Sequence, residues 1–352
     1  MAYTTIDDPS AYFHTQLYTG NGASSHSITN DANAGDFKPD WLWIKQRSQG
    51  SRSHSQWDTS RGNSQRLQSD NSFGEETQTN DQKTFDTDGF TVGAGSITNE
   101  NSQTFVAWQW KANGGTTSSN TDGSITSTVQ ANTTAGFSIV SYQGNTTADT
   151  VGHGLGQAPD WIIVKNRDTG NEWVHYHKSL GADSYIYFTT AAAASGDSSV
   201  WNNTAPSSSV FSIGTSNATS GETSSNNLIA YCFAEKQGYS KIGSYTGNGN
   251  ADGPFVYTGF KPAWIMIKRT DAANSWYLVD STRGSTNVIS AELEANNNGA
   301  EATSNVRLDS LSNGYKIRTS GAAYNASGGT YIYMAFAKHP FVGSDGVPTT
   351  AR

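Results

Sequence analysis

A segment of the form Pro-x-Trp, followed by an apolar run and by a lysine four residues after the tryptophan, occurs three times in the 352-residue chain. The three tryptophans are Trp41, Trp161 and Trp264. Other landmarks keep a constant order around them. A Tyr-x-Gly-Asn turn lies 19 to 23 residues upstream, an aromatic residue 49 to 51 residues downstream, and the end of an apolar closing segment 67 to 70 residues downstream. Four anchors that recur in the same order indicate three copies of one structural unit.

These repeats divide the chain into three predicted units, residues 1–112, 125–238 and 239–352. Residues 113–124 separate the first two units, and their Gly, Ser, Thr and Asn content is typical of a flexible linker. The second and third units follow each other almost directly at residues 238–240. We therefore expect units 2 and 3 to pack closely together and unit 1 to stand further off.

The anchor segments have the pattern of strands and not of helices. They alternate or form short apolar runs rich in Ile, Val, Tyr, Phe and Trp, and Gly, Asn, Asp and Ser turns bound them. In residues 41–44 both faces are apolar, as in a central strand, and Lys45 and Arg47 are expected to mark its exit. Ten Trp, 16 Tyr and 14 Phe supply large core side chains. The sequence predicts an all-β chain of three tandem β-sandwich, jelly-roll domains.

Charge and composition exclude several classes of protein. The net charge is −8 and there is no Lys/Arg cluster, so the concentrated basic face that nucleic-acid binding needs is missing. The N-terminal residues lack a basic region followed by an apolar stretch, and the longest apolar runs have strand length, which predicts neither a signal peptide nor membrane insertion. The single cysteine, Cys232, cannot form an internal disulfide and is expected to be a small buried hydrophobe.

One repeated motif has the composition of a catalytic site. Asp58 and Arg61, and likewise Asp280 and Arg283, lie three residues apart beside hydroxyl side chains. Unit 2 has His177 at the matching place and keeps neither charge. A turn stabilised by an Asp–Arg contact explains all three copies better than a catalytic role does.

Other reactive residue types are sparse. His175 and His177 lie at i and i+2 on one predicted strand, which suits either a zinc or nickel pair or two surface imidazoles, and no Cys or third His stands at metal-ligand spacing nearby. The acidic pairs at residues 7–8 and 75–76 lie in polar segments and are expected to be solvated. No nucleophile elbow, P-loop, zinc-protease helix or dinucleotide fingerprint is present. The sequence therefore predicts no catalytic, cofactor-binding or metal-binding residue.

Aromatic side chains are the best binding candidates in such a chain, because sugars present apolar faces that stack on aromatic rings. Most of the aromatic residues occupy the repeated anchor positions, where filling a core is the expected role. Trp201 is less clearly an anchor and is the one tryptophan singled out as a binding candidate.

Four stretches, residues 123–142, 152–156, 235–249 and 252–262, together with the opening residues 7–10 and the closing residues 331–333, resemble a family of tailed-phage virion proteins. These proteins are common in marine phages and are usually labelled tail-fibre or structural protein. The resemblance covers nearly the whole chain. It implies a phage particle component with lectin-like, concanavalin-like β-sandwich domains, and it carries over no catalytic residues.

The leading hypothesis is a non-enzymatic virion structural protein, tail-fibre-like or another surface appendage, that uses no cofactor. It would assemble in the host cytoplasm, with other virion proteins as partners. Unit 1 would dock on the particle while units 2 and 3 project, and a homo-oligomer is expected, with a trimer favoured by the symmetry of virion appendages.

Three alternatives remain open. The protein could decorate the capsid instead of the tail. It could be a carbohydrate-binding module that recognises host surface glycans, with aromatic residues exposed on one face. An enzyme that degrades surface polysaccharide would instead need two carboxylates in one cleft, roughly 5 to 10 Å apart.

Overall fold

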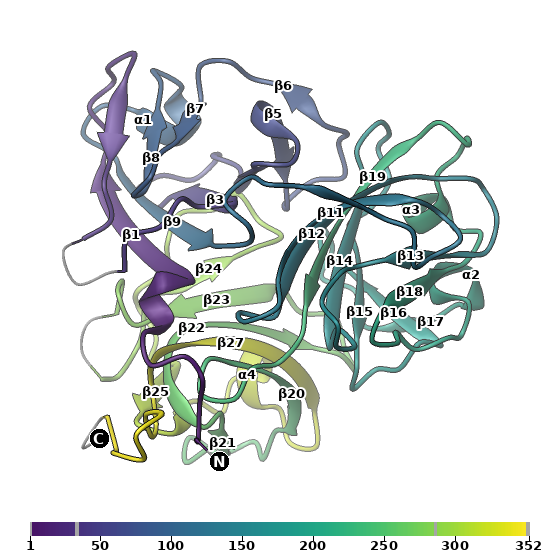
Figure 1. Cartoon of the computed structure of the whole chain (residues 1–352). Coiled ribbons are helices and arrows are strands. Elements are labelled where there is room, and N and C mark those ends of the chain that lie inside the picture. The colour runs from purple at the N-terminus through teal and green to yellow at the C-terminus, as the bar shows by residue number, and fades with distance from the viewer. Residues whose placement is uncertain (1, 32–34, 285–286, 350–352) are drawn as a thin grey trace.

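The computed structural model describes residues 2–31, 35–284 and 287–349 of the chain. Its element order and sheet pairing confirm the predicted all-β fold. Each of the three sequence units contributes one large antiparallel sheet and one small sheet, and the four α-helices in the described residues are four residues long. The units form three lobes, purple to blue, teal, and green to yellow in chain order (Figure 1).

Unit 1 contains a short 3-10 helix, η1 (Pro9–Ala11), a six-stranded sheet and a three-stranded sheet. The large sheet has the order β1 (Phe13–Thr19), β9 (Thr104–Trp110), β3 (Trp41–Gln46), β4 (Ser55–Asp58), β5 (Gly62–Gln68) and β6 (Glu76–Thr77). The small sheet has the order β2 (His26–Ile28), β8 (Phe90–Val92) and β7 (Gln82–Phe85), and helix α1 (Ser96–Asn99) precedes the closing strand β9.

Unit 2 repeats this arrangement with two added strands at one edge. Its large sheet has the order β10 (Ser118–Asn120), β11 (Ser127–Asn132), β12 (Phe137–Gln143), β19 (Asn227–Phe233), β14 (Trp161–Asn166), β15 (Val174–His177), β16 (Ser184–Tyr187) and β17 (Ser195–Gly196). The small sheet pairs β13 (Asp149–Gly152) with β18 (Val210–Ile213), and the helices are α2 (Ser198–Trp201) and α3 (Asn217–Ser220).

Unit 3 has the same strand order in its five-stranded sheet. The strands are β20 (Ser240–Thr246), β27 (Thr330–Pro340), β22 (Phe260–Arg269), β23 (Trp276–Asp280) and β24 (Leu293–Glu294). The small sheet has the order β21 (Phe255–Tyr257), β26 (Gly314–Ile317) and β25 (Leu308–Leu311), and helix α4 (Ala322–Asn325) precedes the closing strand.

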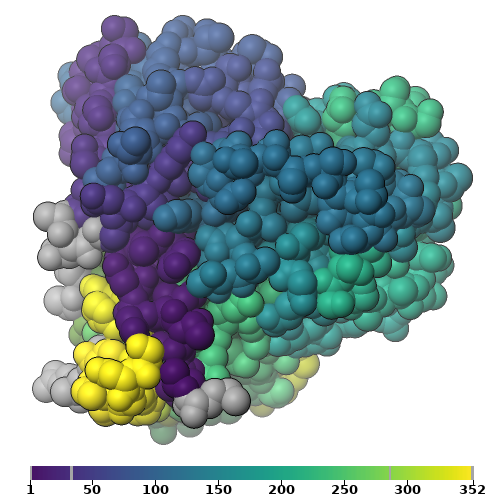
Figure 2. Space-filling model, viewed as in Figure 1, coloured from purple at the N-terminus to yellow at the C-terminus, as the bar shows by residue number. Residues whose placement is uncertain are grey.

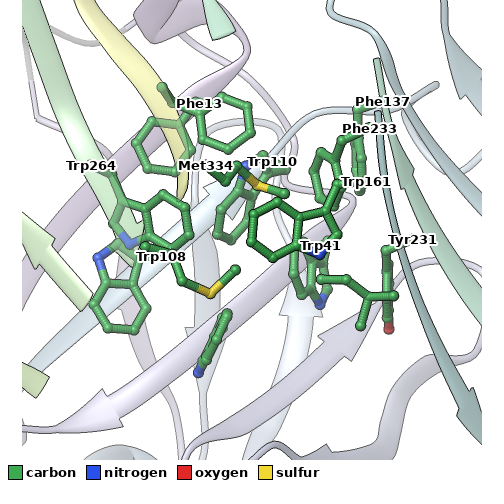
Figure 3. Close-up of a cluster of buried hydrophobic side chains, with 14 of the residues drawn as sticks. Phe13, Trp41, Trp108, Trp110, Phe137, Trp161, Tyr231, Phe233, Trp264 and Met334 are labelled. Atoms are coloured by element: carbon green, nitrogen blue, oxygen red, sulfur yellow. The ribbon is translucent and has the colours of Figure 1, made fainter. Parts of the chain in front are cut away.

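The repeated tryptophan strand lies at the centre of each large sheet and is apolar on both faces for a structural reason. One face of each sheet packs on its own small sheet, which gives each unit an outer core. The other face packs against the other two units in a single central core. This central core holds eight of the ten tryptophans: Trp41, Trp43, Trp108, Trp110, Trp161, Trp173, Trp264 and Trp276. Figure 3 shows side chains of all three units converging there.

The central core determines where unit 1 sits. Trp41 of unit 1 stacks on Tyr231 of unit 2 with the ring centroids 4.5 Å apart, and Phe13 of unit 1 stacks on Phe336 of unit 3 at 5.0 Å. Figure 2 shows the three lobes in contact with one another. Unit 1 therefore packs against the other two units, and the expectation that it stands further off is wrong. The physical reason is that an isolated unit 1 would expose its tryptophan face to water.

The segment predicted as a flexible linker, residues 113–124, also differs from the prediction. Residues 118–120 form the edge strand β10 on unit 2. The preceding turn is held by two hydrogen bonds: the Gly114 N–H donates to Asp40 Oδ2 at 2.8 Å, and the Gly115 N–H donates to Gln130 Oε1 at 2.8 Å. Ser, Thr and Asn suit a solvent-exposed edge strand as well as a linker, so composition alone did not distinguish the two.

Candidate functional site

The Asp–Arg motif of unit 1 forms a turn, as predicted. Asp58 ends β4, and its Oδ1 accepts hydrogen bonds from the backbone N–H groups of Ser60 and Arg61 at 3.0 and 2.9 Å. The Arg61 Nε donates to Asp58 Oδ2 at 2.5 Å, and both side chains are fully buried. The motif therefore builds and closes the turn between β4 and β5.

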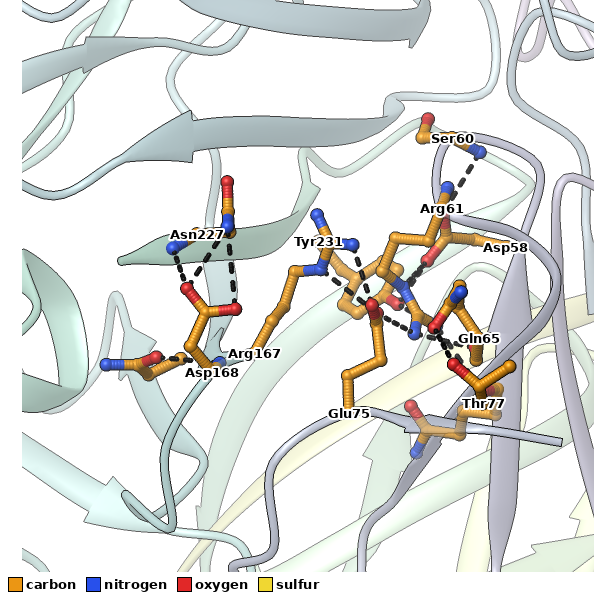
Figure 4. Close-up of polar contacts among 12 residues, drawn as sticks. Asp58, Ser60, Arg61, Gln65, Glu75, Thr77, Arg167, Asp168, Asn227 and Tyr231 are labelled. Carbon is orange, nitrogen blue, oxygen red and sulfur yellow. Dashed lines mark hydrogen bonds and ion pairs between the residues drawn. The ribbon is translucent and has the colours of Figure 1, made fainter. Parts of the chain in front are cut away.

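The same motif also joins unit 1 to unit 2 (Figure 4). The Tyr231 hydroxyl of unit 2 donates to Asp58 Oδ2 at 2.7 Å. Glu75 of unit 1 accepts from Arg61 at 2.9 Å and from Arg167 of unit 2 at 2.7 Å. We call this set the 1/2 junction. The sequence analysis found Asp58 and Arg61 but not the groups that they contact. Glu75 was expected to be solvated, and Arg167 and Tyr231 lie more than 90 residues further along the chain.

Asp280 and Arg283 make the corresponding contacts between units 3 and 1, at the 3/1 junction. The Trp108 indole N–H of unit 1 donates to Asp280 Oδ2 at 3.1 Å, and the Arg283 guanidinium lies 5.3 Å from the Trp108 ring centroid. Glu301 of unit 3 accepts from Arg283 at 2.9 Å and from Arg47 of unit 1 at 2.7 Å. Trp108 thus takes the place that Tyr231 has in the 1/2 junction.

The third junction, between units 2 and 3, keeps the backbone hydrogen bond of the other two but lacks their Asp–Arg and Glu–Arg pairs. A backbone N–H bonds the facing carbonyl in all three junctions: Glu75 to Arg167 at 2.6 Å, Glu301 to Arg47 at 2.9 Å, and Ala194 to Thr270 at 3.0 Å. Ala194 and Thr270 therefore replace the Glu and Arg of the other two junctions. The three units close a ring, 1 to 2 to 3 to 1, and the Asp–Arg motif lies in two of its three junctions.

Glu75 and Arg61 of the 1/2 junction favour each other's ionised form. Burial works against ionisation of Glu75, but the hydrogen bonds from Arg167 and the charge of Arg61 lower its pKa below the usual range. Burial alone would lower the pKa of Arg61, but the carboxylates of Asp58 and Glu75 raise it. Each of these charged groups forms an ion pair within its own turn or with another unit. None of them is therefore presented to a substrate as a general acid or base.

The histidine pair is buried, which corrects the alternative of two surface imidazoles. His175 and His177 are both 0 % exposed on β15. His175 Nδ1 accepts from the Trp161 indole at 2.9 Å, and His177 Nδ1 accepts from the Ser179 N–H at 3.0 Å. Among the described residues, no group of three or more His, Cys, Asp or Glu is arranged to hold a metal ion.

Burial sets the protonation of both imidazoles. It lowers the pKa of His177 to about 3, and the neighbouring Lys178 acts in the same direction. Burial also lowers the pKa of His175 well below its ordinary value. Both rings are therefore neutral at physiological pH and act as hydrogen-bonding core groups.

Trp201, the tryptophan singled out as a binding candidate, lies in the outer core of unit 2. It is 1 % exposed and packs edge-on against Tyr176 at 5.9 Å. Cys232 is buried in the same core, as predicted. The aromatic residues of the anchor positions are core residues, and Trp201 joins them.

The two acidic pairs behave differently from each other. Glu75 belongs to the 1/2 junction and is not solvated, while its neighbour Glu76 pairs with Arg66. Asp7 is exposed and accepts a hydrogen bond from the Ser344 N–H at 2.6 Å, and Asp8 accepts from the Ser10 N–H at 3.0 Å at the start of η1. Only the pair at residues 7–8 has the exposed position expected for it.

Lys45, which was expected to mark a strand exit, is buried, and so are the two lysines at the matching positions of the other units. Lys45, Lys165 and Lys268 are 0 % exposed. Each ammonium reaches a backbone carbonyl of another unit: Asn298 at 3.4 Å, Ser72 at 3.0 Å and Ala191 at 3.3 Å, in that order. Their constant position four residues after the tryptophan was the available signal, since a solvated lysine need not keep its spacing.

Two surface hollows lie next to each other on unit 3. One, of about 800 Å³, is lined by polar residues that include Lys261, Asn287 and Ser310. The other, of about 610 Å³, lies between units 1 and 3, with His14, Thr282 and His339 on its wall. The wall of the first hollow is mostly polar and suits a polar ligand, whereas the wall of the second mixes apolar and polar groups.

The chain belongs to the family described as "Domain of unknown function (DUF7483)", whose model matches residues 8–340. No curated protein matches the chain. The described part of the chain also contains no helix of the length and hydrophobicity needed to cross a membrane.

Replacing only Arg61 of the buried Asp58–Arg61 pair should lower the free energy of unfolding more than replacing both residues. Arg61→Leu leaves the buried Asp58 carboxylate without its cation, and we expect it to lower the free energy of unfolding by about 3–5 kcal/mol. The double variant Asp58→His/Arg61→Leu copies unit 2, which has His177 and Leu180 at these positions. It should recover roughly half of that loss. Urea unfolding measures both, and a double variant no more stable than Arg61→Leu would contradict the assignment.

Acid should destabilise the protein through its buried histidines. In the unfolded chain the imidazole of His177 is protonated below about pH 6.5, whereas in the folded protein it stays neutral down to about pH 3. The free energy of unfolding therefore falls as the pH falls through this window. We expect His177 to account for about 2 kcal/mol of the stability lost between pH 7 and pH 5. His177→Asn keeps an acceptor for Ser179 and cannot titrate. Urea unfolding at the two pH values should show a smaller loss for this variant, and an equal loss would contradict the prediction.

Proposed function

We propose that this member of the DUF7483 family is a non-enzymatic structural protein of a tailed-phage virion, tail-fibre-like or another surface appendage, that contributes to particle architecture and to host-surface adhesion. The observation that carries the proposal is the use of the reactive side chains. The Asp–Arg motifs, the buried lysines and the histidine pair all make contacts between units or within cores. Such an interior supports a role in which the molecule must stay rigid.

The resemblance of the chain to tailed-phage virion proteins supports the same proposal. Other virion proteins are the proposed partners, and the virion, assembled in the host cytoplasm, is the proposed location. Capsid decoration stays the alternative placement on the particle.

The internal ring bears on the proposed oligomeric state. Virion positions are symmetric, and the sequence favoured a homotrimer. One chain already arranges three related units around one core, with Trp41, Trp161 and Trp264 in equivalent places. A single chain therefore supports a three-fold position as well as a trimer does, and the mass in solution distinguishes the two.

The proposal predicts that the protein is present in purified particles at a fixed copy number. Particles of the phage that encodes it are banded on a density gradient, quantified by mass spectrometry and labelled with immunogold against the purified protein. We expect gold at discrete sites on the particle, at the tail for an appendage and over the head for a decoration protein.

A lysate protein that fails to band with particles provides the control for adventitious carry-over. If the chain is abundant in the lysate and absent from banded particles, the virion proposal is overturned. Release of reducing sugar from host capsule by the purified protein would overturn its non-enzymatic part.

A further inference from the structure

Two large aromatic side chains point to solvent from strand β21, at the edge of the small sheet of unit 3. Phe255 is 44 % exposed and Tyr257 is 53 % exposed, while Val256 between them is buried in the outer core. This alternation places both rings on the outward face of the sheet. β21 lies low in the view of Figure 1, beside the N-terminus.

The repeats show that the fold does not require aromatic residues at these two places. Val256 pairs with Tyr315, as Ile28 pairs with Phe90 in unit 1 and Val151 with Phe211 in unit 2. The positions that correspond to Phe255 and Tyr257 are therefore Ser27 and Thr29 in unit 1, and Thr150 and Gly152 in unit 2. Ser27 and Thr29 are exposed as well. Unit 3 alone presents aromatic rings at exposed positions where small or polar residues suffice.

Charged side chains flank the rings on the same face. Phe255 lies opposite Lys316, and Lys316 lies opposite Asp309, so the three share one row across the sheet. Lys316 pairs with Asp252 at 2.7 Å, and Asp309 pairs with Arg318 at 3.0 Å.

The Phe255 ring lies close to the backbone of β26 at Gly314. A Cβ at Gly314 would lie 2.1 Å from the Val256 carbonyl oxygen and 3.0 Å from Phe255 Cζ, so the backbone of β21 and the edge of the ring both approach β26 closely there. A flat ring beside hydrogen-bonding groups is the arrangement on which a sugar ring can stack.

Tyr3 extends the aromatic surface. Its hydroxyl donates to the Gly259 carbonyl at 2.8 Å and lies 3.3 Å from the Tyr257 hydroxyl. Beyond Tyr3 is a shallow hollow of about 620 Å³ whose wall includes Gln237, Ser344 and Asp345. Tyr3 thus continues the aromatic surface of Phe255 and Tyr257 as far as this hollow.

We propose that this outward face, defined by Phe255, Tyr257, Tyr3 and Lys316, binds a saccharide chain. The C–H faces of sugar rings would stack on the aromatic rings, and their hydroxyls would pair with the flanking carboxylate and ammonium groups. The inference rests on the adhesive part of the proposed function and assigns it to unit 3. A protein partner is disfavoured, because the centres of protein interfaces are depleted in Lys and Asp and this face places them next to its rings.

The test compares a variant that removes the two rings of the proposed face with a variant that removes an exposed ring elsewhere. Phe255→Ser/Tyr257→Thr introduces the residues that unit 1 carries at the same places. Phe73→Ser removes a ring of unit 1 that is 62 % exposed and lies outside the proposed face. Each full-length protein is applied to an array of bacterial capsular and lipopolysaccharide O-chain oligosaccharides, and the bound saccharides are titrated by calorimetry. Thermal unfolding verifies that each variant is folded, and Tyr257→Thr alone replaces the double variant if that one is not.

We expect the wild type and Phe73→Ser to bind the same saccharides with equal affinity, and the double variant to bind at least about tenfold more weakly. Equal affinity of the double variant would overturn this site while leaving adhesion by another face intact. A wild type that binds no saccharide would overturn the inference without touching the virion proposal, which immunogold labelling decides. Loss of particle incorporation in the double variant, without saccharide binding by the wild type, would assign the face to a protein partner and also overturn the inference.

Discussion

The packing of three tryptophan-bearing sheet faces into one central core is the constraint on which the rest of the structure depends. Each large sheet is apolar on both faces, and its own small sheet covers only one of them. The second face can leave water only against the other two units, because no other apolar surface of that size exists in the described chain. The ring of units, the burial of Trp41, Trp161 and Trp264, and the ordering of residues 113–124 all follow from this requirement.

The ring explains why buried charges occur in so uncharged a protein. A buried ion pair adds little stability over apolar packing, but it penalises any arrangement in which one partner is missing. Asp58 and Asp280 each need a donor from the next unit, Tyr231 in one junction and Trp108 in the other. The third junction has His177 and Ala194 in place of the Asp and the Glu. Between units 2 and 3, Lys241 forms an ion pair with Glu235 at 3.0 Å. The two Asp–Arg junctions therefore disfavour arrangements in which a partner is missing, while apolar burial supplies most of the stability.

Periodicity made the repeats, the strands and the all-β class predictable, because the residues that build one sandwich recur at fixed spacing. The turn made by Asp58 and Arg61 was predictable for the same reason. What the sequence could not supply was the relation between units: Glu75 looked like a solvated loop residue and Lys45 like a strand exit, since their partners lie in other units. The exposed pair Phe255 and Tyr257 carried a usable signal, as the same positions in unit 1 hold Ser27 and Thr29, but reading it required the strand pairing.

Differential scanning calorimetry of the intact chain tests the shared core most directly. If the three units depend on one core, they unfold together, and the calorimetric enthalpy equals the van't Hoff enthalpy of a single transition. Two or three resolved transitions, or a calorimetric enthalpy two to three times the van't Hoff value, would mean that the units are stable separately. The central core would then be a contact surface between independent domains, and the account given for the ring would be contradicted.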